Sequence, residues 1–599
     1  MDNLPHWDLA PICPGIDSPQ LAGSFSELAS LIDQVEHHQR AVLSALGAKT
    51  RAADLPRGLD AAVDLFNRAW LVGGTVWSYL EYVVAADTRD AAAAKKLSEL
   101  EMLIARLRQA WTRFQGWLHS IADVLPRAIE KAGTAREHSF ILMETAAQGA
   151  FLMSEPEEML AAELNLSGAN AWSKLQRTIT SQLSVEIELD GATKTLPMPG
   201  IINLYTDPRE PVRRQAWEAE MREWKKTKEQ LAACLNGVKG SAGTLNGRRG
   251  RADALHAPVD LARIDRATLD TLLGCMKDSL PLFRRYFKAK AARMGKEKLA
   301  WWDLFAPCGA TGTVFTWEAT RSLILETFGT FSPRLRALAE RAFEARWIDA
   351  EPRAGKSGGG FCGPVPALKE SRILVNFNGS RDLVSTVAHE LGHAFHNDCA
   401  YRAGKTELQQ LTPMTLAETA SIMCESIVNA ALLSRAGTPQ EKLAILETEL
   451  VTASQVIVDI YSRFLFEKEV MDRRAKGELS ADDLCDIMER AQAAAYGEAL
   501  DERYRHPYMW TWKPHYYGVG LDFYNFPYAF GQLFSTGLYA VYKSRGPDFV
   551  PEYETLLAST GEATAADLAA RFGIDIRSRA FWDGSIDIIR KSIDRYCAL

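Results

Sequence analysis

The sequence predicts a mainly α-helical protein with little β-structure. Two long segments, 91–125 and 441–474, are rich in Ala, Leu, Glu and Arg, and their apolar residues recur every three or four positions. This spacing is typical of amphipathic helices that bury one face. A coiled coil is the alternative, but Trp, Phe and Ala interrupt any regular heptad. Only two stretches, 184–200 and 370–380, break the helical pattern.

Length and composition predict a globular protein with more than one packed core. A chain of 599 residues is well beyond the size at which a single core suffices. Its 47% hydrophobic and 24% charged residues are ordinary for a globular protein. A formal charge of −7 does not favour nucleic acid or an anionic membrane as a partner.

The amino terminus and the cysteines both favour a cytoplasmic protein. The opening residues do not combine a basic segment with an apolar one, and no long uninterrupted apolar run occurs in the chain, so we expect neither export nor a membrane span. Nine cysteines are scattered without a CxxC pair. This pattern favours reduced thiols over a disulfide framework or a cysteine-based zinc site.

The two non-helical stretches are predicted to form short β-elements. In 184–200, apolar and polar residues alternate up to an Asp190-Gly191 turn, which is the pattern of a β-hairpin. In 370–380, a short apolar run ends at Asn378-Gly379 and is followed by Ser380, a residue type that caps helices. We therefore expect a strand that leads directly into a helix.

That helix carries a metal-binding pattern. His389 and His393 are four residues apart, so their imidazoles lie about 40° apart around the helix and can converge on one ion. Glu390 follows the first histidine and completes an H-E-x-x-H motif, which supplies two zinc ligands and a carboxylate that can act on a water molecule. The alternative is a buried helix whose histidines only form hydrogen bonds.

A catalytic zinc of this type needs a third protein ligand. Glu418 is the first candidate, because it lies on a second predicted helix that also carries Glu425 two turns later on the same side. Glu418 could instead belong to a capping box with Thr415. Glu407 is a weaker candidate in a polar stretch. His396 shares the histidine face and is expected to pack in the core or to support a ligand.

Five segments together resemble peptidase family M3, and specifically its oligoendopeptidase F branch, which is related to thimet oligopeptidase. These segments are "WDLAPICPGIDSP" near the start, "ILVNFNGS", "HELGHAFH", "LAETASIMCE" and "KPHYYGVGLDFYNFPYAFG" at 513–531. The resemblance therefore spans nearly the whole chain.

The resemblance implies two helical halves that enclose a deep channel, with a small β-sheet beside the H-E-x-x-H helix and one zinc ion at the channel floor. It implies an amino-terminal helical domain, 1–200, with the hairpin near 184–198, and a catalytic domain, 201–599. The expected partners are short peptides, cleaved as by an endopeptidase; no oligomeric state is indicated.

The family pattern also implies roles for single residues. The zinc ligands would be His389, His393 and Glu418, the base Glu390, and Glu425 would contact a ligand rather than the metal.

The same pattern places residues that stabilise the transition state in the carboxy-terminal segment. His515 matches the family's histidine, and Tyr524 is the first choice for the tyrosine, with Tyr517 second. Where relatives carry a Y-x-Y pair, this chain has Tyr524-Asn525-Phe526, so one hydroxyl is missing. The other aromatic residues of the region are interpreted as core, namely Tyr508, Trp510, Trp512, Phe523 and Tyr528.

These residues predict a mechanism in which a zinc-bound water attacks the scissile carbonyl, Glu390 moves the proton, and His515 with a tyrosine stabilises the charge on the carbonyl oxygen. Two alternatives are a carboxypeptidase with the same motif and a zinc-stabilised peptide-binding protein without hydrolysis. The presence of Glu390 argues against the second.

Two segments have predicted roles in handling the substrate. The strand 373–378 would pair its backbone with an extended peptide if it lies at a sheet edge, or would be internal to a small sheet. The glycine-rich loop 355–360 lacks the ending of a phosphate-binding loop and could close over bound peptide; a rigid, buried loop would contradict this.

Overall fold

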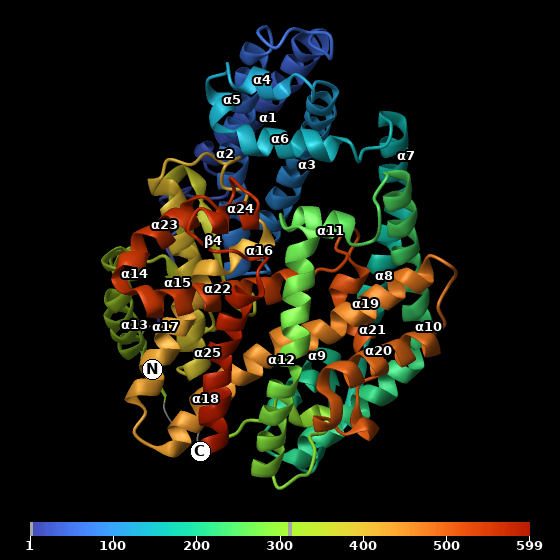
Figure 1. Ribbon diagram of the computed structural model, residues 1–599, viewed down its shortest axis with the longest axis vertical. Helices are drawn as coiled ribbons and strands as arrows, with labels where there is room; N and C mark the ends of the chain where they lie inside the picture. The colour runs from blue at the N-terminus through green and yellow to red at the C-terminus, as the bar shows by residue number, and fades with distance from the viewer. Residues whose placement is uncertain (1–3, 310–313) are drawn as a thin grey trace. The chain divides into compact units, whose positions relative to one another are not determined.

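The computed structural model describes residues 4–309 and 314–599, and the protein is mainly helical, as predicted (Figure 1). The chain folds into two compact units. The first unit contains residues 4–152, 314–431 and 541–574, and the second contains 153–309, 432–540 and 575–599. The chain passes between the units several times, so neither compact unit begins or ends at residue 200. The two sequential domains, 1–200 and 201–599, stay a prediction.

The elements of the first unit are α1 (Pro19–Ala41), α2 (Pro56–Ala86), α3 (Ala91–Ser120), α4 (Leu125–Ile129), α5 (Thr134–Glu137), α6 (Ser139–Gly149), α13 (Trp317–Phe331), α14 (Pro333–Glu344), β3 (Ile348–Asp349), β4 (Phe361–Val365), β5 (Glu370–Leu374), α15 (Arg381–Arg402), α16 (Met414–Ala417), α17 (Thr419–Arg435), α23 (Val550–Ala558) and α24 (Ala565–Ala570).

The elements of the second unit are α7 (Glu155–Ser167), α8 (Ala169–Gln182), β1 (Ser184–Leu189), β2 (Ala192–Pro197), α9 (Met198–Asn203), α10 (Glu210–Arg248), α11 (His256–Leu261), α12 (Arg266–Arg293), α18 (Pro439–Ser454), α19 (Ile460–Arg474), α20 (Ala481–Tyr496), α21 (Met509–Trp512), α22 (Phe526–Arg545) and α25 (Arg579–Ala598). Short 3₁₀ turns join several of these helices.

A hydrophobic core joins the amino-terminal helices of the first unit to its sheet. Helices α1, α2, α3 and α6 pack against one another. Their buried apolar side chains form one cluster that also includes Val365 of β4 and Leu374 of β5. Since burial of apolar surface is the main stabilising contribution in folding, this cluster fixes the sheet on the helical layer.

The sheet of the first unit has the order β3-β5-β4. Strand β5 pairs in parallel with β3 and antiparallel with β4, where Cys362 lies opposite Ile373. The predicted strand therefore exists, but it ends at Leu374 and has a partner on both sides. The prediction that 373–378 forms a substrate-binding edge is wrong, because β4 and β3 occupy both edges of β5. Strand β4 is the outer strand next to it.

The glycine-rich loop is fixed at its beginning. The side chain of Lys356 is buried, donates hydrogen bonds to the backbone carbonyls of Asp349, Glu351 and Val375, and lies 2.7 Å from the Asp349 carboxylate. The backbone N–H of Ser357 donates to the carbonyl of a residue in α2. These contacts contradict a closing motion of 355–357, whereas 358–360 are exposed.

Helix α15 begins as its sequence predicts. The Ser380 side chain accepts a hydrogen bond from the backbone N–H of Leu383, and Asp382 lies in the first turn, where it interacts favourably with the helix dipole. One face buries apolar residues such as Val384, Val387 and Leu391. Since α15 contacts β4, β5, α14 and α23, that face anchors the helix in the first unit.

Helices α15 and α17 approach each other closely at Gly392. A Cβ atom on Gly392 would lie 2.6 Å from both the carbonyl oxygen of Ala420 and the Cα of Ser421. Only a residue without a side chain fits there. Tyr553 of α23 donates a hydrogen bond to the carbonyl of Thr419, the first residue of α17. The crossing and this hydrogen bond together fix the start of α17 against the middle of α15.

In the part of the chain that the structure describes, α16 and α17 form the one stretch, 414–435, whose length and hydropathy would suit a membrane span. Its most apolar window is 56% buried within the protein, as expected of a core helix.

The second unit is built around the 39-residue helix α10, which packs against α8, α19 and α20. Helices α12 and α25 run side by side (Figure 1). The predicted hairpin is present as β1 and β2, joined at Asp190 and Gly191, both with positive φ. The predicted helix 441–474 is α18 and α19, joined by one π-helical turn at Gln455–Asp459.

We expect Gly392→Ala to lower the free energy of unfolding by about 1–3 kcal/mol, because the added methyl group forces α15 and α17 apart. Gly116→Ala in α3 is the matched control, since no atom lies within 4 Å of its Cβ position, and it should stabilise the protein by about 0.5–1 kcal/mol. Denaturant unfolding of both variants measures the difference. Equal stability would contradict the close crossing.

Candidate metal centre

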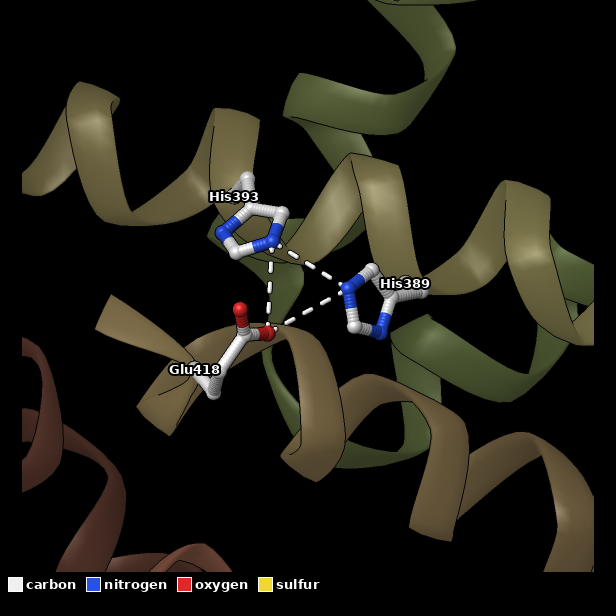
Figure 2. Close-up of side chains that lie close together, drawn as sticks. All are labelled: His389, His393 and Glu418. Atoms are coloured by element: carbon white, nitrogen blue, oxygen red, sulfur yellow. Dashed lines mark hydrogen bonds and ion pairs between the residues drawn. The ribbon is translucent and has the colours of Figure 1, made fainter. Parts of the chain in front are cut away.

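Three predicted ligands converge in the first unit (Figure 2). The Nε2 atoms of His389 and His393 are 3.2 Å apart, and they lie 3.3 and 3.4 Å from Oε2 of Glu418. Both imidazoles come from α15, and Glu418 lies between α16 and α17. Among the described residues, this is the group of histidine, cysteine and acidic side chains whose geometry could hold a metal ion.

The spacing of these atoms fits a small tetrahedral cation. An ion held at about 2.0–2.1 Å from nitrogen and oxygen ligands in tetrahedral geometry separates its ligand atoms by roughly 3.3–3.4 Å. The three distances, 3.2, 3.3 and 3.4 Å, match that separation. Two imidazoles and one carboxylate also leave a fourth position open, as in catalytic zinc sites.

Two further side chains orient the ligands. Nδ1 of His389 hydrogen-bonds to Oε1 of Glu425. With a proton on Nδ1, the lone pair of Nε2 points toward Glu418 and His393. The hydroxyl of Ser421 donates a 2.7 Å hydrogen bond to Oε2 of Glu418, the oxygen that faces the histidines. Both contacts restrict the directions in which the ligand atoms can turn.

The two carboxylates of the centre have different environments. Burial raises the pKa of Glu390, and the charges of His389 and His393 only partly offset this effect. Burial also acts to raise the pKa of Glu418, but hydrogen bonds and charges from the same histidines lower it overall. Glu418 therefore stays ionised and suits a cation, whereas Glu390 has the higher proton affinity that general base catalysis requires.

Gly360 lies close to Glu390. A Cβ atom on Gly360 would lie 3.4 Å from Oε1 of Glu390 and 3.1 Å from the Thr386 side chain. The exposed end of the glycine-rich loop thus borders the buried carboxylate of Glu390, and a side chain at residue 360 would press on Thr386 and contact that carboxylate.

Other candidate ligands from the sequence lie outside this group. Nε2 of the buried His396 is 2.9 Å from the Thr560 hydroxyl, which fits its predicted packing role. Glu407 is not among the grouped ligands, and burial raises its pKa to about 7. The predicted capping box at Thr415 is not formed, because Pro413 caps α16 and Glu418 follows its last residue.

The second set of predicted residues lies in the other unit. His515 is in a 3₁₀ turn, Pro514–Tyr517, and its ring stacks on Tyr524 with centroids 5.8 Å apart. Burial, with the charges of Arg463 and Lys513, lowers the pKa of His515 to about 3, so the imidazole is neutral at neutral pH. Within the described chain, its Nε2 has no hydrogen-bond partner.

The tyrosines of this segment differ in exposure. Tyr524 is half-buried, and its hydroxyl lies 2.8 Å from the hydroxyl of Tyr528. Tyr517 is fully buried. Tyr524 is therefore better placed than Tyr517 to reach a ligand. Tyr528, interpreted from the sequence as core, hydrogen-bonds to Tyr524 instead.

The sequence prediction missed Ser421. The available signal was its position three residues after Glu418 on a predicted helix, where side chains i and i+3 are neighbours. The structure thus groups His389, Glu390, His393, Glu418 and Glu425 in one unit and His515, Tyr517 and Tyr524 in the other, while their catalytic roles stay predictions.

Part of the chain matches a known protein family. The sequence model of peptidase family M3 matches residues 331–588. An oligoendopeptidase F homologue of Lactococcus lactis subsp. lactis is 25% identical over 325 residues, 54% of this chain and 53% of the relative. Oligopeptidase PepF of Bacillus subtilis is 21% identical over 79% of this chain and 70% of its own. The chain thus matches about half the length of the first of these relatives.

Solved structures share the fold over nearly the whole chain. A crystal structure from Chlamydophila abortus superposes with a TM-score of 0.82 at 18% identity and covers 99% of this chain and 98% of its own. Oligoendopeptidase-F from Enterococcus faecium gives a TM-score of 0.70 at 17% identity, covering 96% and 98%. The segment 331–588, which matches the model of peptidase family M3, contains all three converging ligands, and the chain is similar to oligoendopeptidase F proteins in sequence and in fold.

Proposed function

We propose that this protein is a zinc-dependent endopeptidase that hydrolyses short oligopeptides. The observation that carries this proposal is the convergence of His389, His393 and Glu418 to within 3.2–3.4 Å, with Glu390 beside them. Zinc is favoured by two imidazoles and one carboxylate in tetrahedral spacing. The names of the relatives, oligoendopeptidase F and oligopeptidase PepF, support peptides as the substrate class. The cytoplasm remains the predicted location.

His389, His393 and Glu418 would hold the zinc ion, which when bound supplies Lewis acidity that polarises a carbonyl group and acidifies water. Glu390 would accept the proton of the attacking water and deliver it to the leaving amine. The raised pKa of Glu390 supports this role. A carboxyl group whose pKa is shifted toward the working pH can both accept a proton and return it.

His515 and Tyr524 would donate hydrogen bonds to the oxygen of the scissile carbonyl as negative charge develops on it. The neutral imidazole of His515, with Nε2 unpaired, and the half-buried hydroxyl of Tyr524 support this assignment. Donors fixed in advance contribute most in the transition state, where the charge is largest.

Glu390→Gln should lower kcat by about 10²–10⁴-fold, because the amide cannot carry the proton, while the zinc content stays unchanged. A quenched fluorescent peptide measures the rate. Glu407→Gln is the control, since this carboxyl lies outside the metal group. Equal rates for wild type and Glu390→Gln would contradict the role of Glu390.

Mass spectrometry of the products from the same assay tests the type of cleavage. Internal fragments are expected. Single residues released from peptide ends would indicate a carboxypeptidase instead.

Ser421→Ala should weaken zinc binding by about 10–100-fold, because it removes the hydrogen bond that orients the Glu418 carboxylate. Ser426→Ala on the same helix is the matched control, as its hydroxyl donates a hydrogen bond to the backbone carbonyl of Ile422. Competition with a chromophoric chelator measures both affinities. If both variants lost zinc affinity equally, the cause would be destabilisation of the helix and not loss of the hydrogen bond to Glu418.

Tyr524→Phe and His515→Ala should each lower kcat by about 10²–10³-fold with little change in KM, as expected for donors used in the transition state. Steady-state kinetics with the fluorescent peptide measures both constants. If Tyr517→Phe causes the loss and Tyr524→Phe does not, the assignment of the tyrosine is wrong.

A further inference from the structure

The segment that carries His515 and Tyr524 has little regular structure to hold it. We call residues 513–525 the Tyr524 loop. After the 3₁₀ turn that contains His515, the backbone adopts positive φ at Gly520 and at Phe523, 78° and 53°. A bulky residue such as Phe is strained in this region, and the strain persists only where surrounding contacts impose it.

A buried lysine supplies such a contact. Lys239 of α10 places Nζ 2.8 Å from Oδ1 of Asp522 in the Tyr524 loop and 2.6 Å from Oε1 of Glu467 in α19. The side chains of Lys239, Glu467 and Asp522 are only 1%, 2% and 8% exposed. The loop is therefore tied, two residues before Tyr524, to two helices of the same unit.

The charges of this triad make the tie hard to break. Burial acts to lower the pKa of Lys239, but Asp522 and Glu467 raise it overall, so the ammonium group stays charged. If Asp522 moved away, the buried ammonium group of Lys239 would lose one of its two carboxylate partners, and water could not replace it. Removing one partner from a buried ion pair is strongly unfavourable for that reason.

A second tie holds the other side of Tyr524. Nη1 of Arg463 in α19 donates a 3.3 Å hydrogen bond to Oδ1 of Asn525, and the Arg463 guanidinium also pairs with Asp459. Arg463 and Glu467 are four residues apart, so they project from the same face of α19. Tyr524 thus lies between Asn525, which contacts α19 directly, and Asp522, which is linked to α19 through Lys239.

Another buried lysine of the second unit makes a different kind of contact. Lys290 of α12 lies 2.6 Å from Glu447 of α18, and both side chains are at least 94% buried, so this pair joins two helices. Lys239 differs because one of its partners belongs to an irregular segment that carries residues of the proposed reaction.

We propose that Lys239 is a positioning residue, which fixes Asp522 and thereby holds Tyr524, with the stacked ring of His515, in the geometry that donates hydrogen bonds to the reacting carbonyl oxygen. This inference rests on the proposed function. It adds a residue that touches neither metal nor substrate and acts through the Tyr524 loop.

The first test needs no substrate. Backbone amide hydrogen exchange over 518–525 should become faster in Lys239→Met than in wild type. In Lys290→Met, which removes an equally buried lysine from a helix–helix pair, exchange in this segment should not change. Asp522→Asn keeps the volume and one acceptor, so it should give a smaller change in the same direction without a large loss of folding. Unchanged exchange over 518–525 in both Lys239→Met and Asp522→Asn would overturn the proposal.

The second test separates positioning from general stability. Lys239→Met should lower kcat by about 10- to 1000-fold with KM nearly constant, approaching the loss caused by Tyr524→Phe, while Lys290→Met should change kcat less than about threefold. In the double variant Lys239→Met/Tyr524→Phe, the loss in kcat should be clearly smaller than the product of the two single losses, because residues that act as a unit are not additive. Any loss beyond that of Tyr524→Phe alone is assigned to His515, whose ring stacks on Tyr524. The proposal would be overturned if the kcat losses of Lys239→Met and Tyr524→Phe multiplied in the double variant. It would also be overturned if Lys290→Met lowered kcat as much as Lys239→Met does.

The two tests also distinguish this inference from the proposed function. If wild type cleaves no peptide under zinc-saturated conditions, the proposed function fails, and the catalytic role of Lys239 fails with it. Faster exchange in Lys239→Met would then still establish the lysine as the anchor of the Tyr524 loop.

Discussion

The close crossing of α15 and α17 at Gly392 is the constraint on which the metal centre depends. His389 and His393 are neighbours on one helix by their spacing alone, but Glu418 reaches them only because the backbones of the two helices touch. A Cβ atom at residue 392 would lie only 2.6 Å from the Ala420 carbonyl oxygen and would clash with it. Gly392 is the second of the two x positions in the H-E-x-x-H motif. This position thus requires a residue without a side chain, for a structural reason that is separate from metal binding.

Both clusters of candidate residues use burial to set charge. In the first unit, neighbouring histidines keep Glu418 ionised in a site where burial alone would favour its protonated form, while Glu390 retains a raised pKa. In the second unit, burial and nearby cations keep His515 neutral. Burial thus opposes charge in both clusters: the histidines overcome it at Glu418, whereas nearby cations reinforce it at His515.

Local patterns in the sequence predicted local structure well. The N-cap at Ser380, the amphipathic helices and the paired histidines depend on residues a few positions apart, and the structure contains each of them. The position of β5 was not predictable in the same way, because whether a strand is internal depends on which distant strands pair with it. The tie made by Lys239 left no local signal either, since Glu467 and Asp522 are 228 and 283 residues away.

The π-helical turn at Gln455–Asp459 sets the orientation of the face of α19 that holds the Tyr524 loop. Each residue of an α-helix advances the direction of its side chain by about 100°, so one inserted or deleted residue rotates everything that follows. Closing this turn to ordinary α-helix by deleting a residue would swing Arg463 and Glu467 a quarter of a revolution or more away from Asn525 and Lys239. The extra residue in the π-helical turn thus rotates α19 relative to α18. With this rotation, Arg463 faces Asn525 and Glu467 faces Lys239.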